Sequence, residues 1–576
     1  MWMLLSLAAG QAMAQAPDAD AQRRARRESE LLQQREQLQR QAEERMQLQQ
    51  APEVKLQEDK AHSTDDAALP EEAPCFAIRE LRLALPAQLS PAQSRLGASL
   101  LPLDAFHFLQ QALDVYRDKC IGREGLNLIG RRMSALLLAR GYSTTRVGIP
   151  EQDLSAGTLT LVLIPGVIGS IGLGRPGMPG SWRSAFPARP GDLLNLRELE
   201  QGMEQMKRVP SHEVEMQISP GDRLGESDIV INVAATKPWR LSASLDDSGA
   251  KGTGKLQAGL NLALDNPLGL NDLFNVTLNT DADRSGNQRG TTGNNFSWSV
   301  PYGDWSFAVA AGSYRYHQRF AGLFQSFTSS GKSDNMDVRA TWMIQRDQQQ
   351  KNSIQFKIGK RWSRAYLEDT ELDNQRRNAS FAEIAWLHRR RLGSAQLDLS
   401  LANRWGVSWF NGDADPAFRQ PGDPTLRYTL QTIDASLLAP FALAGQSLTY
   451  IGALRGQSTR SVLHASEQLS IGNRYTVRGF DGELSLAAER GFFMRNEIDA
   501  PLGERNHSLY AGLDIGKLYG PAVSKLLGDK LAGAALGMRG NLLGLSYDMF
   551  IGWALYKPQN FRTGAQAAGF SLGYQY

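Results

Sequence analysis

The stretch Gln396-Leu-Asp-Leu-Ser-Leu401 alternates without a break between polar and apolar side chains. The same alternation recurs over 274–279 and 354–358, and from Leu543 to Leu555 it places seven apolar side chains at every second position. A β-strand points successive side chains to opposite faces, so each run would have one apolar and one polar face. Asn, Asp, Gly and Pro separate the runs, which predicts a series of antiparallel strands from about Trp239 to the C-terminus.

The apolar face of these strands could contact either lipid or a second sheet. Beyond the N-terminus, no apolar run reaches the ~18 residues of a membrane-spanning helix. Without such helices a chain crosses a membrane only as a closed barrel, because every backbone polar group must be paired within it. About ten residues of alternation per strand is typical of these barrels, and residues 238–576 would hold roughly sixteen strands. The alternative is a soluble all-β sandwich with one wet face.

Aromatic residues favour the transmembrane antiparallel β-barrel over the sandwich. The apolar faces carry tryptophans like those in the girdles of transmembrane barrels: Trp305, Trp362, Trp405 and Trp553. The chain also ends on an alternating segment, 570–576, whose last residue is aromatic. We expect the barrel-assembly machinery to recognise the aromatic side chains of this segment: Phe570, Tyr574 and Tyr576.

The N-terminus combines the features of an export signal with those of a long helix. Residues 1–14 have a short apolar core and the small-residue cleavage site Ala12-Met13-Ala14, which predicts a signal peptide. Within residues 15–51, the stretch 19–51 lacks glycine and carries one thin apolar stripe. This predicts a helix that cannot hold a core of its own: a coiled coil, a solvated tether or a plug in a polar channel. Residues 52–73 are polar and are predicted to be a linker.

Residues 74–164 and 165–237 each mix strand and helix patterns, which predicts two small α+β modules. In the first module we expect helices over 106–112 and 126–140. In the second, Asn195 is predicted to cap a helix from Leu196 to Met206, with Glu198 completing a capping box. Alternating segments predict strands over 76–83, 159–163, 167–171, 214–218 and 228–233.

The chain has two cysteines, Cys75 and Cys120, and both lie in the first module. Behind an export signal they would meet an oxidising compartment, where thiols tend to pair. A disulfide closing this segment would stabilise the module by roughly 3–4 kcal/mol. The alternative is a pair of free thiols.

Alternation also assigns charged side chains to the inside of the barrel. On two strands near the C-terminus, Asp514, Arg495 and Glu497 lie on the face opposite the apolar side chains, so they should face the lumen. Between strands of this region, 474–483 is predicted to be a long loop that contains Arg478. If the loop folds inward, Arg478 can form a charge-assisted pair with Asp514 or Glu497. The alternative is a solvated surface loop.

Short motifs follow one another along the chain. Val477-Arg478-Gly479-Phe480 lies in the loop, and Gly512-Leu-Asp514-Ile-Gly516 lies on a later strand. Cys75-Phe-Ala-Ile78, the segment 196–211 and Asp265-Asn-Pro-Leu-Gly269 precede them in that order. The series resembles the transporter component of two-partner secretion systems, the haemolysin and filamentous-haemagglutinin export family, from about residue 74 to the C-terminus.

The resemblance implies an outer-membrane pore of a Gram-negative bacterium, with periplasmic POTRA domains at 74–164 and 165–237. It gives the N-terminal helix the role of a plug, places Val477, Arg478, Gly479 and Phe480 at the tip of an inward-folded loop, and pairs Arg478 with Asp514. The implied partner is one large secreted exoprotein. The POTRA domains would recognise it, and the barrel would pass it outward unfolded and without nucleotide hydrolysis, with or without activating it.

Two other functions fit a barrel of this kind. One is an insertase that folds other barrels into the membrane, and the other is a general diffusion porin. The two POTRA-like modules and the plug-like helix favour secretion over both.

Enzymatic chemistry has no support in the sequence. The seven histidines form no H-E-x-x-H motif and no paired metal-ligand spacing, and no G-x-S-x-G motif occurs. We therefore expect no catalytic function, no metal and no cofactor. The formal net charge is +3, and glutamates offset the arginines of the N-terminal helix, so no nucleic-acid partner is expected.

Overall fold

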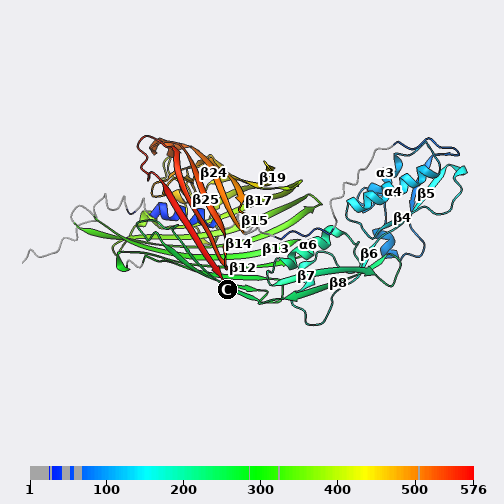
Figure 1. Cartoon of the computed structure of the whole chain (residues 1–576), viewed down its shortest axis with the longest axis horizontal. Coiled ribbons are helices and arrows are strands. Elements are labelled where there is room, and N and C mark those ends of the chain that lie inside the picture. The colour runs from blue at the N-terminus through cyan, green and yellow to red at the C-terminus, as the bar shows by residue number, and fades with distance from the viewer. Residues whose placement is uncertain are drawn as a thin grey trace, which may run out of the picture.

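The computed structural model describes residues 25, 29–41, 52–56, 68–283, 286–321, 325–503 and 506–576. The predicted signal peptide at 1–14 lies outside the described residues, as do parts of the predicted helix and linker. Two small modules and a barrel lie in a row, and the C-terminus lies at the barrel end next to the second module (Figure 1). We call that end of the barrel proximal and the opposite end distal.

The predicted barrel is confirmed. Within the described ranges, sixteen long antiparallel strands form a closed sheet, in which β9 (Trp239–Asp246) pairs with β27 (Ala567–Gln575). A two-residue strand, β16 (Thr370–Glu371), lies at the tip of one hairpin. The other strands are β10 (Gln257–Asp265), β11 (Leu273–Asp281), β12 (Arg289–Tyr302), β13 (Trp305–Ala321), β14 (Ser326–Arg346), β15 (Gln350–Leu367), β17 (Arg377–Leu392), β18 (Ala395–Val407), β19 (Thr429–Leu443), β20 (Gln446–Thr459), β23 (Arg490–Pro501), β24 (His507–Tyr519), β25 (Lys530–Leu542) and β26 (Leu545–Tyr556).

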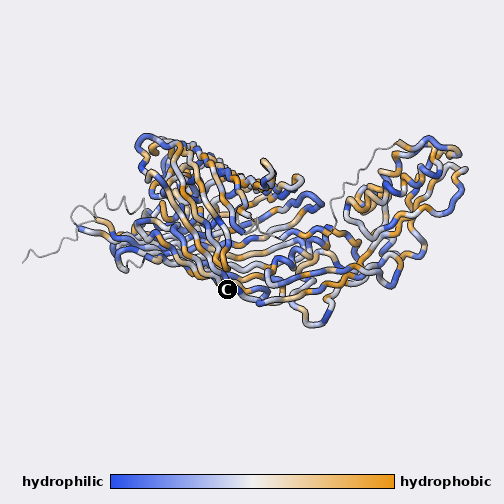
Figure 2. Tube along the Cα trace, in the orientation of Figure 1, coloured by the Kyte–Doolittle hydropathy of each residue, from blue (hydrophilic) through white to orange (hydrophobic). Residues whose placement is uncertain are grey.

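The alternation in sequence becomes an apolar exterior and a polar interior. Hydrophobic and hydrophilic residues alternate along the barrel strands (Figure 2). On β24, Leu513 is 61% exposed on the outer face, whereas its neighbour Asp514 is 3% exposed. At the proximal end, Trp305 and Trp342 stack on adjacent strands with their ring centroids 5.6 Å apart. The outer face therefore has the composition that lipid requires.

The first module packs three helices on two small sheets. One sheet has the order β2 (Glu80–Ala84), β5 (Thr158–Ile164), β4 (Arg146–Gly148), and the other pairs β1 (Phe76–Ile78) with β3 (Lys119–Ile121). The helices are α2 (Pro91–Leu96), α3 (His107–Asp114) and α4 (Arg123–Ala139). Buried apolar side chains from both sheets, from α3 and α4 and from the residue before α3 form one core: Ile78, Phe106, Leu109, Ile129, Leu159 and Leu161.

The structure confirms one sequence prediction for this module and contradicts another. The predicted disulfide is confirmed, since Cys75 is bonded to Cys120 beside the β1–β3 pair. The prediction of one strand over 76–83 is wrong. The chain bends at Arg79, because the backbone amides of Arg79 and Glu80 both donate to the Gly157 carbonyl, at 2.8 and 3.1 Å. This contact with a distant residue splits the segment between two sheets.

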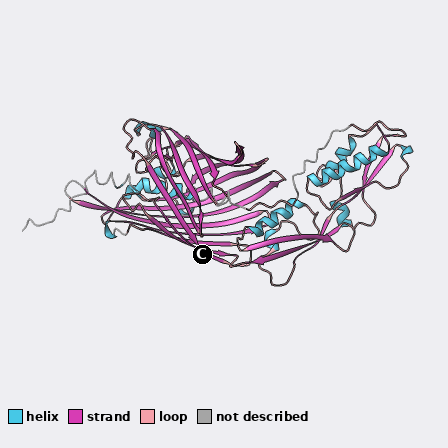
Figure 3. Ribbon diagram, in the orientation of Figure 1, coloured by secondary structure: helices cyan, strands magenta, loops and turns pink. Residues whose placement is uncertain are grey.

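The second module has a sheet of order β6 (Val167–Leu173), β8 (Glu226–Ala235), β7 (His212–Pro220), covered by α5 (Trp182–Ala185) and α6 (Leu196–Lys207). Asn195 caps α6, since its side chain accepts a hydrogen bond from the Arg197 amide at 2.9 Å. Helix α6 packs tightly, because a Cβ at Gly202 would lie 2.2 Å from the Phe186 ring. The long helices lie in the two modules and inside the barrel (Figure 3).

The second module is joined to the proximal end of the barrel by buried hydrogen bonds. The Asn271 side chain, in the turn between β10 and β11, donates to the Ser181 carbonyl at 2.7 Å. The Gly303 amide, in the turn between β12 and β13, donates to the Ser184 carbonyl at 2.8 Å. Asp272 accepts from the Trp298 indole at 3.0 Å. The Asp265–Gly269 motif and Asp272 therefore form the turn that receives the module, in which the Asn266 amide donates to the Asp272 carbonyl at 2.7 Å.

Candidate functional site

The segment between β20 and β23 folds into the barrel rather than into solvent. Its base is a short hairpin, β21 (Leu469–Ile471) with β22 (Leu486–Ala488). Val477 and Phe480 are buried in an apolar cluster that also contains side chains of the barrel wall: Phe493, Leu518 and Leu531. We call residues 472–485 the lumenal loop. Its apolar side chains hold it against the wall, so its position is set by packing as well as by charge.

Arg478 lies at the centre of this loop and contacts two carboxylates of the wall. Its Nε donates to Asp514 Oδ2 at 2.7 Å and its Nη2 to Asp514 Oδ1 at 2.9 Å. Its Nη1 donates to Glu497 Oε2 at 2.6 Å, and its backbone amide donates to Asp514 Oδ2 at 3.0 Å. The guanidinium is 3% exposed, so this is a buried, bidentate charge pair. The structure thus brings Arg478 together with both of the carboxylates that face assignment had placed in the lumen.

Glycines make room for this contact. Gly479 has φ +96°, and a Cβ there would lie 2.3 Å from the Trp553 carbonyl oxygen. A Cβ at Gly512 would lie 2.3 Å from the Arg478 guanidinium, and one at Gly533 would lie 1.8 Å from the Arg478 carbonyl oxygen. Gly479 and Gly512 belong to the motifs that the sequence singled out. Gly533 does not, because its role depends on β25 lying beside β24, which short motifs do not show.

A helical segment, residues 29–41, lies within the barrel (Figure 1). Gln34 donates to the Ala465 carbonyl at 3.0 Å, and Arg361 of β15 donates to Gln37 at 3.4 Å. Arg35 donates to the Gly482 carbonyl and lies 3.9 Å from the Glu483 carboxylate. We call this segment the lumenal helix. It therefore touches the lumenal loop a few residues beyond Arg478.

The lumen wall opposite the helix is lined with opposite charges on neighbouring strands. In register, Glu383 lies opposite Arg404, Asp434 opposite Arg455, and Asp398 opposite Arg389. The corresponding N–O distances are 2.7, 3.0 and 2.5 Å. A cavity of about 320 Å³ separates this wall from the lumenal helix. Arg361 and Arg404 share the carboxylate of Glu467, and cations outnumber carboxylates among the residues that line the cavity.

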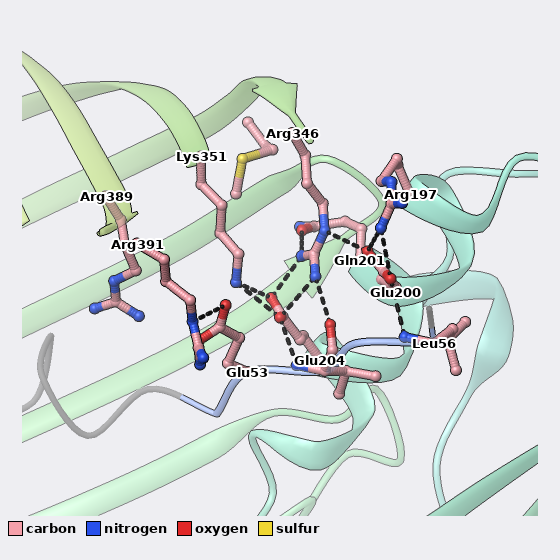
Figure 4. A network of polar contacts seen from close by, with 12 residues as sticks. Glu53, Leu56, Arg197, Glu200, Gln201, Glu204, Arg346, Lys351, Arg389 and Arg391 are labelled. Atoms are coloured by element: carbon pink, nitrogen blue, oxygen red, sulfur yellow. Dashed lines mark hydrogen bonds and ion pairs between the residues drawn. The ribbon is translucent and has the colours of Figure 1, made fainter. Parts of the chain in front are cut away.

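At the proximal end, residues 52–56 lie across helix α6 of the second module (Figure 4). The Val54 amide donates to Glu204 at 2.8 Å, and the Leu56 amide donates to Glu200 at 3.0 Å. Nε of Arg391, on β17, donates to the Glu53 carboxylate at 3.0 Å. We call residues 52–56 the strap. It was predicted only as part of a polar linker, and the structure shows that it is bound on both sides.

Two cations of the barrel complete the contact. Arg346 at the end of β14 donates to Glu204 at 2.7 Å and to the Val54 carbonyl at 3.0 Å, and Lys351 of β15 lies 2.7 Å from Glu204. Glu200 is 1% exposed and is shared by Arg197 and Arg346, at 2.8 and 3.4 Å (Figure 4). One cluster thus joins the strap, the second module and the barrel.

This cluster was missed in the sequence. The sequence does contain a signal for this cluster. Glu200 and Glu204 are four residues apart and so lie on one face of α6, and Arg346 and Lys351 flank a turn of the barrel. Burial raises the pKa of Glu204, but hydrogen bonds and charges from Arg346 and Lys351 outweigh it and hold that pKa below its ordinary value. Glu204 is therefore charged at neutral pH.

The described residues give no sign of a metal site or of a membrane-spanning helix. No group of three or more His, Cys, Asp or Glu side chains there could hold a metal ion. In the same part of the chain, no helix is long and apolar enough to cross a membrane.

Comparison with known families accounts for this combination of modules and barrel. The model described as "Haemolysin secretion/activation protein ShlB/FhaC/HecB" matches residues 225–540, more than half of the chain. The chain belongs to this family. Two POTRA-domain models match as well, a ShlB-type one at 97–166 and a second at 168–220.

Individual relatives support the same assignment. The chain is 43% identical to "Outer membrane transporter CdiB-2" of Burkholderia pseudomallei (strain 1026b), over 88% of each sequence. It is 27% identical to "Hemolysin transporter protein ShlB" of Serratia marcescens, over 78% of this chain and 77% of that one. The solved structure "CdiB from Acinetobacter baumannii" is 27% identical, with a TM-score of 0.82 over 95% of this chain and 99% of that chain.

Membership of the ShlB/FhaC/HecB family fixes how the molecule lies in the cell. The protein is an outer-membrane transporter of two-partner secretion, and its two POTRA domains lie in the periplasm. The proximal end of the barrel is therefore periplasmic and the distal end extracellular. Residues 1–14 and the outer parts of 15–51 lie outside the described residues, and the other predicted domain boundaries remain predictions. So do the assembly role of Phe570, Tyr574 and Tyr576 and the plug role of the helix.

Glu198, in the first turn of α6, does not close the capping box that the sequence predicted. Its carboxylate lies instead near Asp304, in the turn between β12 and β13, and near Asp192. Burial, and then these two carboxylates, raise the pKa of Glu198 to about 7. Repulsion between charges therefore develops where the second POTRA domain meets the barrel as the pH rises.

We expect Glu198→Gln to change the pH dependence of stability. The folded protein holds a proton on Glu198 more tightly than the unfolded chain, so its contribution is present below the ordinary pKa of 4.5 and is lost as the pH rises through about 7. The variant and the parent should melt alike near pH 4 to 5, and the variant should be the more stable near pH 8. Thermal unfolding in detergent tests this, with Glu213→Gln of the exposed face of β7 as control. A stability difference independent of pH would contradict it.

We expect Glu204→Ala to release the strap. The change leaves Lys351 without this carboxylate and Arg346 with only its longer contact to Glu200, and breaking a buried pair costs about 3–5 kcal/mol. The Val54 and Leu56 amides should then exchange hydrogen much faster than in the parent protein. Hydrogen exchange measured by mass spectrometry on the detergent-solubilised protein would detect this, and Glu213→Ala should leave exchange at the strap unchanged. Equal protection in Glu204→Ala would show that the cluster does not hold the strap.

Proposed function

We propose that this protein recognises one large exoprotein in the periplasm and passes it, unfolded, through the barrel to the cell surface without nucleotide hydrolysis. The observation that carries the proposal is the content of the lumen. A helix and an inward-folded loop occupy it and contact each other through Arg35. A general diffusion porin needs no such obstruction, and an open route would require the helix to leave and the loop to move.

The exoprotein would dock on the POTRA domains. β7 and β6 are the two edge strands of the second domain's sheet, and an extended segment can add to such an edge through backbone hydrogen bonds. The first domain offers an apolar contact as well. In the loop between α2 and α3, Leu100, Leu101 and Leu103 are 80%, 65% and 99% exposed. Exposed apolar clusters of this kind mark contact sites for partners, and an unfolded chain supplies apolar segments.

The strap offers a route from docking to opening. It lies in the sequence between the lumenal helix and the first POTRA domain, and it is fixed to both α6 and the barrel. Movement of the second POTRA domain against the barrel would separate Glu204 from Arg346 and Lys351. In our proposal this releases the strap, and the lumenal helix can then leave the barrel.

Arg478 would hold the lumenal loop in its working position. We expect Arg478→Ala to assemble in the outer membrane at normal levels but to lower secretion of the exoprotein by about tenfold or more, because the buried Asp514 loses its partner and Glu497 keeps only Arg539. Arg478→Ala combined with Asp514→Ala should lower secretion by clearly less than the sum of the two single effects, since the two residues act as one unit. Immunoblots of culture supernatant and of the outer-membrane fraction provide the measurement.

Arg562→Ala, an exposed arginine between β26 and β27, serves as the matched control and should secrete normally. Unchanged secretion from Arg478→Ala at normal barrel levels would refute the role of the loop contact.

Deletion of the gene tests the function as a whole. We expect one very large exoprotein to disappear from the surface and medium of the native host, with other outer-membrane barrels unchanged in quantitative proteomics. A general fall in barrel proteins with no single exoprotein lost would instead indicate an insertase. Normal secretion of every exoprotein would rule out the proposal.

A further inference from the structure

Three cations form a row across the outer face of the barrel. Arg315 of β13 lies directly opposite Lys332 of β14, and Lys332 lies directly opposite Arg364 of β15. The residues next to them in sequence, which point to the lumen, are buried: Tyr316, Gly331 and Ala365. Arg315 and Arg364 are exposed and Lys332 is half-buried. The three side chains therefore point away from the lumen, on the face that meets the membrane.

The height of this row on the barrel can be estimated from the strands. At the periplasmic end of the same three strands, a second row of directly opposed residues consists of Trp305, Trp342 and Ile354. Each of them is ten residues away from the cation on its own strand. Ten residues span about 34 Å along a strand, or about 24 Å along the membrane normal at a 45° tilt. The apolar band of such barrels is about 25 Å tall. The cations therefore lie at the extracellular edge of that band, where the headgroups of the outer leaflet begin.

The row is electrostatically unfavourable without an anion. Side chains directly opposite each other on adjacent strands have Cβ atoms about 4.5–5.5 Å apart, and like charges there are destabilising. Lys332 has an ion pair with Asp334 at 2.7 Å. For Arg315 and Arg364, no hydrogen bond or ion pair is found among the described residues. Within the described part of the chain, the row thus has two guanidinium groups without an anionic partner and, between them, a lysine that Asp334 already pairs.

Aromatic residues adjoin the row. The Trp362 ring lies two residues from Arg364 on the outer face, with the Lys360 ammonium 5.1 Å from its centroid. Lys360 also donates to the carbonyl of Phe410, which is 64% exposed. Aromatic rings of this kind lie at the boundary between acyl chains and headgroups. The Trp362 ring therefore offers an apolar contact just below the row, with Asp334 directly opposite it on β14 and Lys360 further toward the periplasm.

A similar but smaller group of cations lies elsewhere on the outer face of the barrel. Lys517 of β24 lies directly opposite Lys530 of β25, again at the extracellular end and on the outer face. The ammonium groups lie 5.2 and 5.3 Å from the ring centroids of Tyr519 and Tyr556. The combination of paired cations and aromatic rings thus recurs at the same end of the barrel.

We propose that Arg315, Lys332 and Arg364 bind the phosphate groups of the glycolipid that forms the outer leaflet, through its lipid A headgroup. Two guanidinium forks can each hold a phosphate through paired hydrogen bonds, and the lysine adds a point charge between them. The acyl chains would pack on the apolar face below, beside Trp362. This proposal depends on the location of the barrel in the outer membrane. It does not depend on how the exoprotein crosses that membrane.

Binding of lipids to the purified, detergent-solubilised protein by native mass spectrometry tests the proposal. The probes are bisphosphorylated lipid A, the same lipid without its phosphates, phosphatidylglycerol and inorganic phosphate. The parent protein should retain bisphosphorylated lipid A. The variant Arg315→Gln, Lys332→Gln, Arg364→Gln should bind it at least tenfold more weakly, and the parent should bind the dephosphorylated lipid no better than that variant does.

Matched variants separate charge from misfolding. The exchange Arg315→Lys, Lys332→Arg, Arg364→Lys keeps every charge and should retain binding. The control Arg123→Gln, Arg131→Gln, Arg175→Gln removes the same net charge from exposed POTRA positions and should bind like the parent. Equal binding by the glutamine variant at the row, or equal binding of dephosphorylated lipid A, would overturn the proposal. Competition by inorganic phosphate at equal concentration would assign the site to free phosphate, and competition by phosphatidylglycerol would remove its specificity for lipid A.

Discussion

Closure of the sheet between β9 and β27 is the constraint on which the rest of the structure depends. Five residue pairs, from Ser571–Asp246 to Gln575–Ser242, join the first and last strands. A spanning sheet with a free edge would expose backbone polar groups to lipid, which offers them no partner. Once the sheet closes, each strand has one face in lipid and one in the lumen. Every charge near mid-membrane must then lie inside, and the barrel becomes a charged, confined space.

That confinement supports our proposal that the Arg478 contact holds the lumenal loop in place. In water an arginine–carboxylate contact contributes little, but Arg478 is buried among Asp514, Glu497 and the apolar cluster around Val477 and Phe480. The same logic recurs at the strap, where Glu204 is enclosed by Arg346 and Lys351. Both sites join parts of the chain that lie far apart in sequence. Since Arg35 of the lumenal helix contacts the lumenal loop, a continuous set of polar contacts runs from the loop to the helix, and a second set fixes the strap to the second POTRA domain.

Local patterns predicted what depends on local physics. The period of two identified the barrel strands, and face assignment placed Asp514 and Glu497 in the lumen opposite Arg478. Helix α2 was missed although its signal is local: Ser90 and Gln93 form a capping box around Pro91. The bend at Arg79 and the strap could not be found in this way. The first depends on the carbonyl of Gly157, and the second on Arg346, a residue almost three hundred positions from Val54.

The paired charges of the lumen wall have a consequence for ion flow. Arg404, Arg455 and Arg389 each lie opposite a carboxylate on the neighbouring strand, so their fields largely cancel within a few ångströms of the wall. A pore lined by a ring of one sign selects ions of the other sign, whereas this wall presents alternating signs at short range. Since Arg361 and Arg404 share the single carboxylate of Glu467, and cations outnumber carboxylates around the cavity, the channel left by a withdrawn helix would prefer anions, but only weakly.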